Sequence, residues 1–337
     1  MKKQNIASLI DSFSGLKALI IGDVMVDSYL WGNVERISPE APVPIVAVTR
    51  RENRPGGAAN VALNVKSLGA IPVICSCIGD DAAGREFLDL LSRENIPAEG
   101  MVVSKNRTTT VKSRIIGNNH QMIRIDEEVI KELTKSERNV LLLKIKELAV
   151  KYDADVIIFE DYDKGVITGE LIEEVVAFAK NAGIPITADP KKKNFLHYKG
   201  VTLFKPNLKE LREGLKIDLE RPDRRELDNA AGELRKSLAI DTVLITLSEH
   251  GIYINNGKVK KIIPAHLRNI ADVSGAGDTV ISVASMCLAL KLPPEQIAVI
   301  SNIAGGQVCE KVGVAPVDKK QLVEELLAAN SNSQRHK

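Results

Sequence analysis

Hydrophobic and polar positions change their spacing repeatedly along this chain. Short apolar runs rich in β-branched residues alternate with longer stretches in which apolar residues recur at helical spacing. The runs predict buried strands of a parallel sheet, and the stretches predict amphipathic helices. The expected strands are 18–22, 72–78, 156–159, 185–188, 201–205 and 242–247. The expected helices are 1–13, 56–68, 82–93, 134–152, 170–181, 276–290, 294–309 and 319–328. This order predicts an α/β fold with a mostly parallel central sheet and helices on both faces.

Two stretches break the rhythm. Residues 29–49 and 108–125 alternate like strands, with no helix between strand partners. We expect them to pair as a small antiparallel β lid that excludes water from a reaction site. The alternative is a surface flap without a catalytic role. The pattern predicts one domain over residues 1–329, and the polar segment 330–337 is expected to be a disordered tail.

Composition narrows the functional classes. The chain has 337 residues, of which 44% are hydrophobic, enough for a substantial core. With 46 basic and 44 acidic residues, the net charge of +2 predicts no general attraction to nucleic acid or membranes. No signal-like or membrane-spanning run is present, so we expect a cytoplasmic protein. Cys75 and Cys77 share one strand face, where core packing is favoured over the alternative of a metal site.

The segment Asp-Val-Ser-Gly-Ala-Gly-Asp-Thr at 272–279 precedes an apolar helical run. Glycines let a ligand approach the backbone closely, and a helix start offers unpaired N–H groups with partial positive charge. Asp278 is therefore a candidate base for a hydroxyl, with the amides of Gly275, Ala276 and Gly277 holding the charge of a transferred phosphoryl group. The alternative is a tight loop with an acidic helix cap.

A second helix opening of small residues stands at 54–62, Arg-Pro-Gly-Gly-Ala-Ala-Asn-Val-Ala. It contains Gly56 and Gly57, and Asn60 falls in the first helical turn. Two such openings, far apart in the sequence, are consistent with one site assembled from both halves of the chain. The arrangement favours a kinase.

Together with Gly79-Asp80-Asp81, the two openings resemble the ribokinase-like (PfkB) family of carbohydrate kinases over nearly the whole chain. Segments 22–27, 36–44 and 54–60 are similar to the members that phosphorylate D-glycero-β-D-manno-heptose 7-phosphate at O1. Those members make the 1,7-bisphosphate in ADP-heptose synthesis for lipopolysaccharide. The resemblance implies a ribokinase-like fold, ATP, Mg²⁺ and a sugar-phosphate substrate. Because the chain ends after the kinase, it also implies a separate nucleotidyltransferase in the pathway.

The resemblance implies a role for each of several groups of residues. Asp278 is the expected general base. The sugar is expected to meet a set of short polar and glycine residues: Asp23, Asp27, Gly56, Gly57 and Asn60. The nucleotide is expected to meet residues that follow the later strands and helices: Lys191, Thr246, Ser248, Gly251, Asn302 and Gly305. The glycines among them also suit close helix packing.

Metal ions and the second phosphate need their own contacts. Asn207 and Glu210 resemble an Asn-x-x-Glu element that organises Mg²⁺, in part through water; a solvated helix face is the alternative. Asp272 resembles a residue linked to monovalent cations, so K⁺ dependence is an open alternative. Glu160 departs from the family, whose members often have serine there. The cations expected to hold the phosphate of the sugar all lie in the lid: Arg36, Lys112, Arg114 and Arg124.

Three other functions compete with this interpretation. The nearest alternative is another sugar kinase of the ribokinase or phosphofructokinase type. A dinucleotide-dependent oxidoreductase is disfavoured, because Gly22-Asp23-Val24 replaces Gly-x-Gly-x-x-Gly after the first strand. A non-catalytic sugar-nucleotide sensor would be expected to lose Asp278. The projecting lid predicts a homodimer in which one lid face is buried by a second copy.

Overall fold

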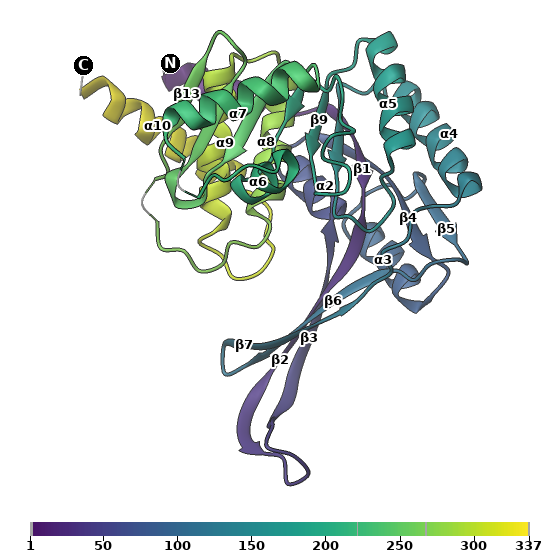
Figure 1. The fold of residues 1–337 in the computed structure, drawn as a ribbon. Coiled ribbons are helices and arrows are strands. Elements are labelled where there is room, and N and C mark those ends of the chain that lie inside the picture. Colours follow the sequence, from purple (N-terminus) through teal and green to yellow (C-terminus); the bar gives the residue numbers. More distant parts are fainter. Residues whose placement is uncertain (1–2, 221, 267, 336–337) are drawn as a thin grey trace.

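The computed structural model describes residues 3–220, 222–266 and 268–335. Within these residues the main sheet has nine strands in the order β13-β12-β11-β10-β9-β8-β1-β4-β5 (Figure 1). All neighbours pair in parallel except β12 and β13, which are antiparallel additions at one edge. The strands are β1 (Lys17–Gly22), β4 (Ile71–Gly79), β5 (Met101–Ser104), β8 (Val156–Glu160), β9 (Ile186–Asp189), β10 (Leu203–Phe204), β11 (Thr242–Thr246), β12 (Ile252–Asn255) and β13 (Lys260–Ile263).

Helices cover both faces of this sheet, as the alternating pattern predicts. In β1, Leu19 and Ile21 pack into one hydrophobic cluster, whereas Ile20 packs into the other. Because successive strand side chains point to opposite faces, every central strand supplies both cores. The Ile20 side is covered by α1 (Lys3–Asp11), α2 (Ala58–Ser67), α3 (Ala82–Arg93), α8 (Ala276–Ala289), α9 (Pro294–Val308) and α10 (Lys319–Arg335). The opposite side is covered by α4 (Lys135–Lys151), α5 (Gly169–Ala182), α6 (Leu208–Leu215) and α7 (Arg224–Ser237).

A second sheet projects from the body in Figure 1, and we call it the arm. Its strands are β2 (Val24–Ile37), β3 (Pro44–Gly57), β6 (Thr110–Gly117) and β7 (His120–Glu127), in the order β3-β2-β6-β7. The outer pairs are antiparallel, as expected for the lid, but the central pair β2–β6 is parallel. The parallel pair arises because α2, β4, α3 and β5, all in the body, lie between β3 and β6 along the chain.

Several boundaries differ from the sequence prediction. The helix expected from Gly56 begins at Ala58, because Gly56 and Gly57 are the last residues of β3. The last helix continues to Arg335, through most of the segment expected to be a disordered tail; residues 336–337 of that segment lie outside the described residues. Hydrogen bonds inside the helix, such as Ser331 Oγ to Leu327 O at 2.9 Å, extend it past Ala328. Helices α6 and α7 and strands β5, β12 and β13 are additional to the expected elements.

Other local predictions are confirmed. Thr134 and Glu137 form the expected capping box at the start of α4. Cys75 and Cys77 are buried in the same hydrophobic cluster, as ordinary core packing requires. No described helix has both the length and the apolar character needed to cross a bilayer.

Candidate active site

The polar side chains of the candidate site gather at the carboxyl ends of neighbouring parallel strands. Glu160 ends β8 and Asp189 ends β9, while Asp23 and Lys205 follow β1 and β10 directly. Ends of adjacent parallel strands meet at one edge of the sheet, which is where α/β proteins bind ligands. The four residues are all buried, so this edge carries charges that have little contact with solvent.

Helix α8 begins over this edge. Gly275 is its N-cap with φ +80°, a conformation that favours glycine, and Asp278 lies in the first turn. The N–H groups of Gly275 and Gly277 bond to no acceptor among the described residues, whereas the Ala276 N–H donates to Val273 O at 3.3 Å. The start of α8 therefore keeps donors that suit an anion.

Asp278 is held in one orientation by two donors from distant segments. Its Oδ2 accepts a hydrogen bond from Asn60 Nδ2 at 2.7 Å, and its Oδ1 accepts one from Tyr162 OH at 2.8 Å. Only 6% of Asp278 is exposed, and burial raises the pKa of its carboxyl despite these two hydrogen bonds. A positioned carboxylate with a raised pKa is suited to accept a proton from a hydroxyl.

The two glycine-rich helix openings meet here, as the sequence predicts. Asn60 lies in the first turn of α2, and a Cβ added to Gly275 would come within 2.9 Å of its Nδ2. Gly57 caps α2 with φ +62°, and a Cβ there would lie 2.3 Å from Asp23 O. Gly275 therefore permits the close approach of the two halves of the chain beside Asp278, and Gly57 permits the start of α2 to lie against the end of β1.

Tyr162 connects the parts of the site, although the sequence analysis assigned it no role. Its hydroxyl bonds Asp278, and its ring lies 5.4 Å from Lys112 Nζ and 5.5 Å from Lys191 Nζ. One signal for Tyr162 was available, since it follows the end of β8 directly after Glu160 and Asp161. Position at a strand end marks it as a site candidate.

Asp23 has a structural role in addition to the sugar contact expected from the sequence. Its carboxylate accepts backbone N–H groups from Tyr162 at 2.9 Å, Lys164 at 3.1 Å and Val166 at 3.0 Å. Only 1% of its surface is exposed. Asp23 thus holds the turn that carries Tyr162, a role that a short acidic side chain at a strand end suits, and its expected contact with the sugar stays a prediction.

A cluster of carboxylates and ammonium groups forms the floor of the site, and we call it the floor cluster: Glu160, Asp189, Lys191, Lys205, Glu210 and Asp278. Lys205 Nζ lies 2.6 Å from Asp189 Oδ2, and both side chains are 3% exposed. Burial alone would lower the pKa of Lys205, but the carboxylate of Asp189 raises it. Breaking such a buried pair from one side typically costs about 3–5 kcal/mol.

Asn207 and Glu210 form a capping box at the start of α6. Asn207 Oδ1 accepts the Glu210 N–H, and Glu210 Oε2 accepts the Asn207 N–H, each at 2.8 Å. The other Glu210 oxygen is paired with Lys191. Both side chains therefore have their oxygens engaged, which fits contact with a divalent metal through water better than direct ligation.

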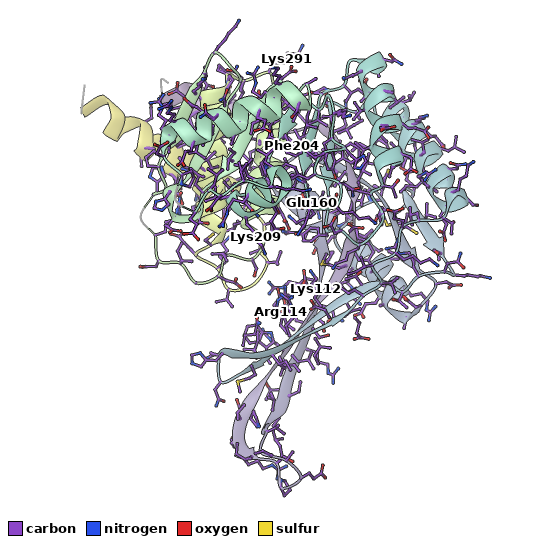
Figure 2. The ribbon with its side chains drawn as sticks, viewed as in Figure 1. Lys112, Arg114, Glu160, Phe204, Lys209 and Lys291 are labelled. Carbon is purple, nitrogen blue, oxygen red and sulfur yellow. The ribbon has the colours of Figure 1, made fainter. Side chains whose placement is uncertain are left out.

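Lys112 and Arg114 lie at the base of the arm, where it joins the body (Figure 2). Arg114 Nη1 lies 2.5 Å from Asp27 Oδ1, and its guanidinium lies 5.3 Å from the centre of the Tyr29 ring. Gly56 permits this arrangement, because a Cβ there would come within 2.1 Å of Asp27 Oδ2. Lys112 forms no ion pair with a described residue, and burial followed by repulsion from Lys164 lowers the pKa of its ammonium.

The remaining expected lid cations are placed differently. Arg124 stands opposite Arg114 in the β6–β7 register, but it is exposed and bonds Asp126 through two 2.9 Å contacts. Arg36 is exposed near the far end of β2, nine residues beyond Asp27. At about 3.3 Å per residue it lies roughly 30 Å along the strand. The structure therefore brings Lys112 and Arg114 to the site of this chain, but not Arg36.

The residues expected at the nucleotide lie on the β11, α8 and α9 side. Thr246 ends β11. Ser248, with φ +52°, is the first residue of the short 3₁₀ turn Ser248–His250, and Gly251, with φ +93°, follows that turn. Asn302 Nδ2 donates to Pro264 O at 2.8 Å. Gly305 packs α9 on α8, since a Cβ there would meet Val280 Cγ2 at 2.6 Å, so close helix packing explains this glycine.

Asp272 joins two loops beside α8. Its Oδ1 accepts the Ser274 N–H at 2.9 Å, and its Oδ2 accepts the Gly313 N–H at 3.0 Å. Burial works against ionisation, but these hydrogen bonds outweigh it and lower the pKa of the carboxyl. Asp272 thus carries a negative charge that also secures the loop leading into the anion-binding helix start.

Comparison with known proteins agrees with this geometry. Residues 16–320 match the model of the pfkB family of carbohydrate kinases. The bifunctional protein HldE of Syntrophotalea carbinolica is 38% identical over 326 residues, and that of Geobacter sulfurreducens is 38% identical over 328 residues. These alignments cover 96% and 97% of this chain but 66% of each relative, so the chain spans just under two thirds of their length.

Solved structures show the same fold. Phosphofructokinase-2 from Escherichia coli, in complex with potassium, aligns with a TM-score of 0.78 at 20% identity, covering 94% of this chain and 99% of that one. Ribokinase from Arabidopsis thaliana, complexed with ribose and ATP, aligns with a TM-score of 0.69 at 16% identity, covering 93% and 99%.

A buried carboxylate at an anion-binding helix start, on the carboxyl edge of a parallel sheet, defines the class as a phosphotransferase acting on an alcohol. The chain belongs to the pfkB family of carbohydrate kinases. It is an ATP-dependent sugar kinase, and its family implies a divalent metal beside the nucleotide.

Proposed function

We propose that this kinase phosphorylates D-glycero-β-D-manno-heptose 7-phosphate at O1, in the route to ADP-heptose and lipopolysaccharide core. The observation that carries the kinase chemistry is the Asp278 carboxylate, fixed by Asn60 and Tyr162 at the start of α8. The heptose assignment is supported by the similarity to relatives named HldE. A cytoplasmic location is part of the same proposal.

In the proposed reaction Asp278 accepts the proton of the O1 hydroxyl. The oxygen then forms a bond to the γ-phosphorus of ATP, and the bond from that phosphorus to the bridging β,γ-oxygen breaks, so ADP leaves with the electron pair. The N–H groups of Gly275 and Gly277 stabilise the charge on the transferred group. Mg²⁺, bound with the nucleotide, would neutralise part of the negative charge of the phosphates.

Lys112 and Arg114 are the proposed contacts for the phosphate already on the sugar. Lys112 is partly buried and forms no ion pair within the described part of the chain, so an anion would relieve the cost of its burial. Arg114 is held in place by Asp27 and by the ring of Tyr29. This pair favours a phosphorylated sugar over ribose, so a ribokinase-type activity is the second candidate function.

For the nucleotide we propose Lys191, Thr246, Ser248, Gly251 and Asn302, on the β11 and α9 side of Asp278. Asn207 and Glu210 would act on Mg²⁺ through water. A role of Asp272 in K⁺ dependence also belongs to the proposal, and phosphofructokinase-2 has been solved in complex with potassium. A separate nucleotidyltransferase partner receives no support, because the relatives are named bifunctional.

A substrate panel tests the assignment. The protein is incubated with ATP, Mg²⁺ and either heptose 7-phosphate, fructose 6-phosphate or ribose, with and without K⁺, and ADP release is followed. We expect the heptose phosphate to give the highest kcat/KM. Turnover of fructose 6-phosphate or ribose with none of the heptose phosphate would overturn the heptose assignment but leave the kinase class intact.

We also propose a homodimer formed through the arm. Apolar side chains stand exposed on β7, with Ile123 54% and Ile125 45% exposed, and strand alternation puts both on one face. Exposed apolar strand faces are commonly covered by a partner. Sedimentation of the wild type and of Ile123→Asp is expected to give a dimer and a monomer, respectively, whereas a monomeric wild type would contradict the proposal.

A further inference from the structure

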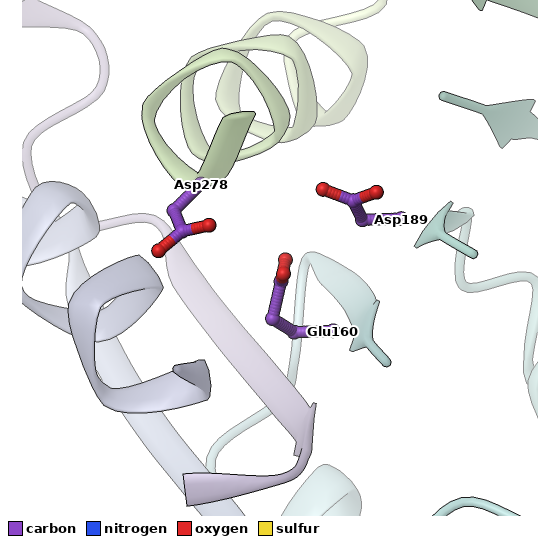
Figure 3. A group of neighbouring side chains, drawn as sticks. All are labelled: Glu160, Asp189 and Asp278. Atoms are coloured by element: carbon purple, nitrogen blue, oxygen red, sulfur yellow. The ribbon is translucent and has the colours of Figure 1, made fainter. Parts of the chain in front are cut away.

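Glu160 is buried without a partner at the centre of the floor cluster. Its side chain is 0% exposed, and neither carboxylate oxygen has a hydrogen-bond partner among the described residues. Figure 3 shows the carboxylate directed between those of Asp189 and Asp278. An unpaired buried carboxylate is costly, so an ion or a proton must accompany it.

The charges around Glu160 do not balance. Four carboxyl groups, those of Glu160, Asp189, Glu210 and Asp278, face two ammonium groups, those of Lys191 and Lys205, so the acidic groups outnumber the basic ones by two. Burial, followed by the nearby carboxylates of Asp189 and Asp278, raises the pKa of Glu160 well above its ordinary value. The Asp189 Oδ1 atom also has no hydrogen-bond partner among the described residues.

The spacing of the oxygens suits such a cation. One ligand atom from each of Glu160, Asp189 and Asp278 lies within 4.8 Å of the other two. Two oxygens bound to one hard divalent ion are about 3–5 Å apart, from adjacent to opposite positions, at metal–oxygen distances of about 2.0–2.6 Å. Carboxylate oxygens are the ligands that Mg²⁺, Mn²⁺ and Ca²⁺ prefer, whereas softer metals prefer nitrogen or sulfur.

We propose that Glu160, Asp189 and Asp278 form a binding site for one hard divalent cation of the Mg²⁺ or Mn²⁺ type, occupied before nucleotide binds. The site is distinct from any metal that arrives with ATP and from the capping box of Asn207 and Glu210. It ties the ends of β8 and β9 to the start of α8. In the proposed function this cation would lie beside the transferred phosphoryl group, and that placement rests on the proposed function.

Mn²⁺ binding to the metal-free protein tests this site without sugar, nucleotide or turnover. Electron paramagnetic resonance of free Mn²⁺ gives the number bound per chain, and Mg²⁺ is added as a competitor. We expect one Mn²⁺ per wild-type chain, displaced by Mg²⁺. In Glu160→Gln, which keeps the shape but removes the charge, we expect affinity at least about 10-fold lower.

Glu226→Gln is the matched control, because Glu226 is a capping-box residue of α7 outside the floor cluster. It is expected to bind Mn²⁺ like the wild type. Thermal unfolding gives a second readout: Mn²⁺ should raise the melting temperature of the wild type and not that of Glu160→Gln, which in EDTA should melt no lower than the wild type.

A wild-type protein that binds no Mn²⁺ without nucleotide would overturn the site, as would equal binding by Glu160→Gln. If the variant does not fold, the wild-type measurement still shows whether the protein binds a divalent cation without nucleotide. Loss of the cation site would leave the sugar-kinase assignment untouched, since the substrate panel tests that assignment separately.

Discussion

The arm and the floor cluster face one another across Tyr162 and carry opposite excess charge. On the arm, Arg114 is balanced by Asp27, whereas Lys112 lies over the ring of Tyr162 and forms no ion pair with any residue that the structure describes. On the floor, Lys205 is balanced by Asp189, and Glu160 has no partner among the described residues. Among the described residues, the arm thus keeps one ammonium group without an ion pair, and the floor keeps one carboxyl group without a hydrogen bond beside two ion pairs.

The difference indicates which ligand each side is built for. An unsatisfied ammonium on the arm suits the anionic end of a sugar phosphate, and an unsatisfied carboxylate on the floor suits a cation. Both sides cost folding free energy when empty, because buried unpaired charges are unfavourable. Ligands that bind only the folded chain recover that free energy as stabilisation.

The largest effect is expected where the two sides meet, at Asp278. Asp278→Asn keeps the shape and the hydrogen-bonding reach of the side chain but removes the proton acceptor. We expect kcat to fall by about 10² or more, the scale typical of general-base loss, while ATP binding by calorimetry stays within a few-fold. Near-normal turnover would show that Asp278 is not the general base.

The charge of the arm is tested by Lys112→Met, which keeps most of the apolar stem. Loss of one charge-assisted contact typically costs about 1.5–3 kcal/mol, or roughly 10- to 100-fold in affinity. We expect KM for the sugar phosphate to rise by about that factor, with little change in kcat or in KM for ATP. The matched control is Arg124→Met, whose cation is exposed and already paired with Asp126, and it should change KM less than about threefold. Equal effects of the two variants would contradict the specific role of Lys112.

The sequence could predict most of the body and the centre of the site, but not the charge balance. Alternating apolar runs and two helix openings were enough to foresee the sheet, its covering helices and the meeting of Asn60 with Asp278. The roles of Asp23, Glu210 and Arg36 could not be foreseen, because they depend on which backbone N–H or ammonium group each side chain meets in three dimensions. The short strands β12 and β13 were not predicted either, since four residues carry little periodic signal.

The buried carboxyl group of Asp161, which precedes Tyr162 in the chain, also predicts that the stability of the fold depends on pH. Burial, followed by the nearby carboxylate of Asp23, raises the pKa of Asp161 to about 7 from its ordinary 3.8. A raised carboxyl pKa stabilises the fold when protonated, so this contribution is complete below about pH 4 and is lost as the pH rises through 7. We therefore expect the melting temperature of Asp161→Asn, relative to that of the wild type in EDTA, to be higher at pH 8 than at pH 5 by about 2 °C or more. A constant difference over that range would show that Asp161 titrates normally.

The smallest effect is expected at the far end of the arm. Arg36 lies roughly 30 Å along β2 from Asp27, judged from strand rise, so in a single chain it has no route to the phosphate of the sugar. Arg36→Ala should change kcat/KM less than about twofold, measured at protein concentrations above and below the dimer dissociation constant. A larger loss confined to the dimer would mean that the arm of one chain supplies a cation to the site of the other. In that case cations from two chains would bind the phosphate of the sugar, and the effect of Lys112→Met on KM would have to be measured in the dimer.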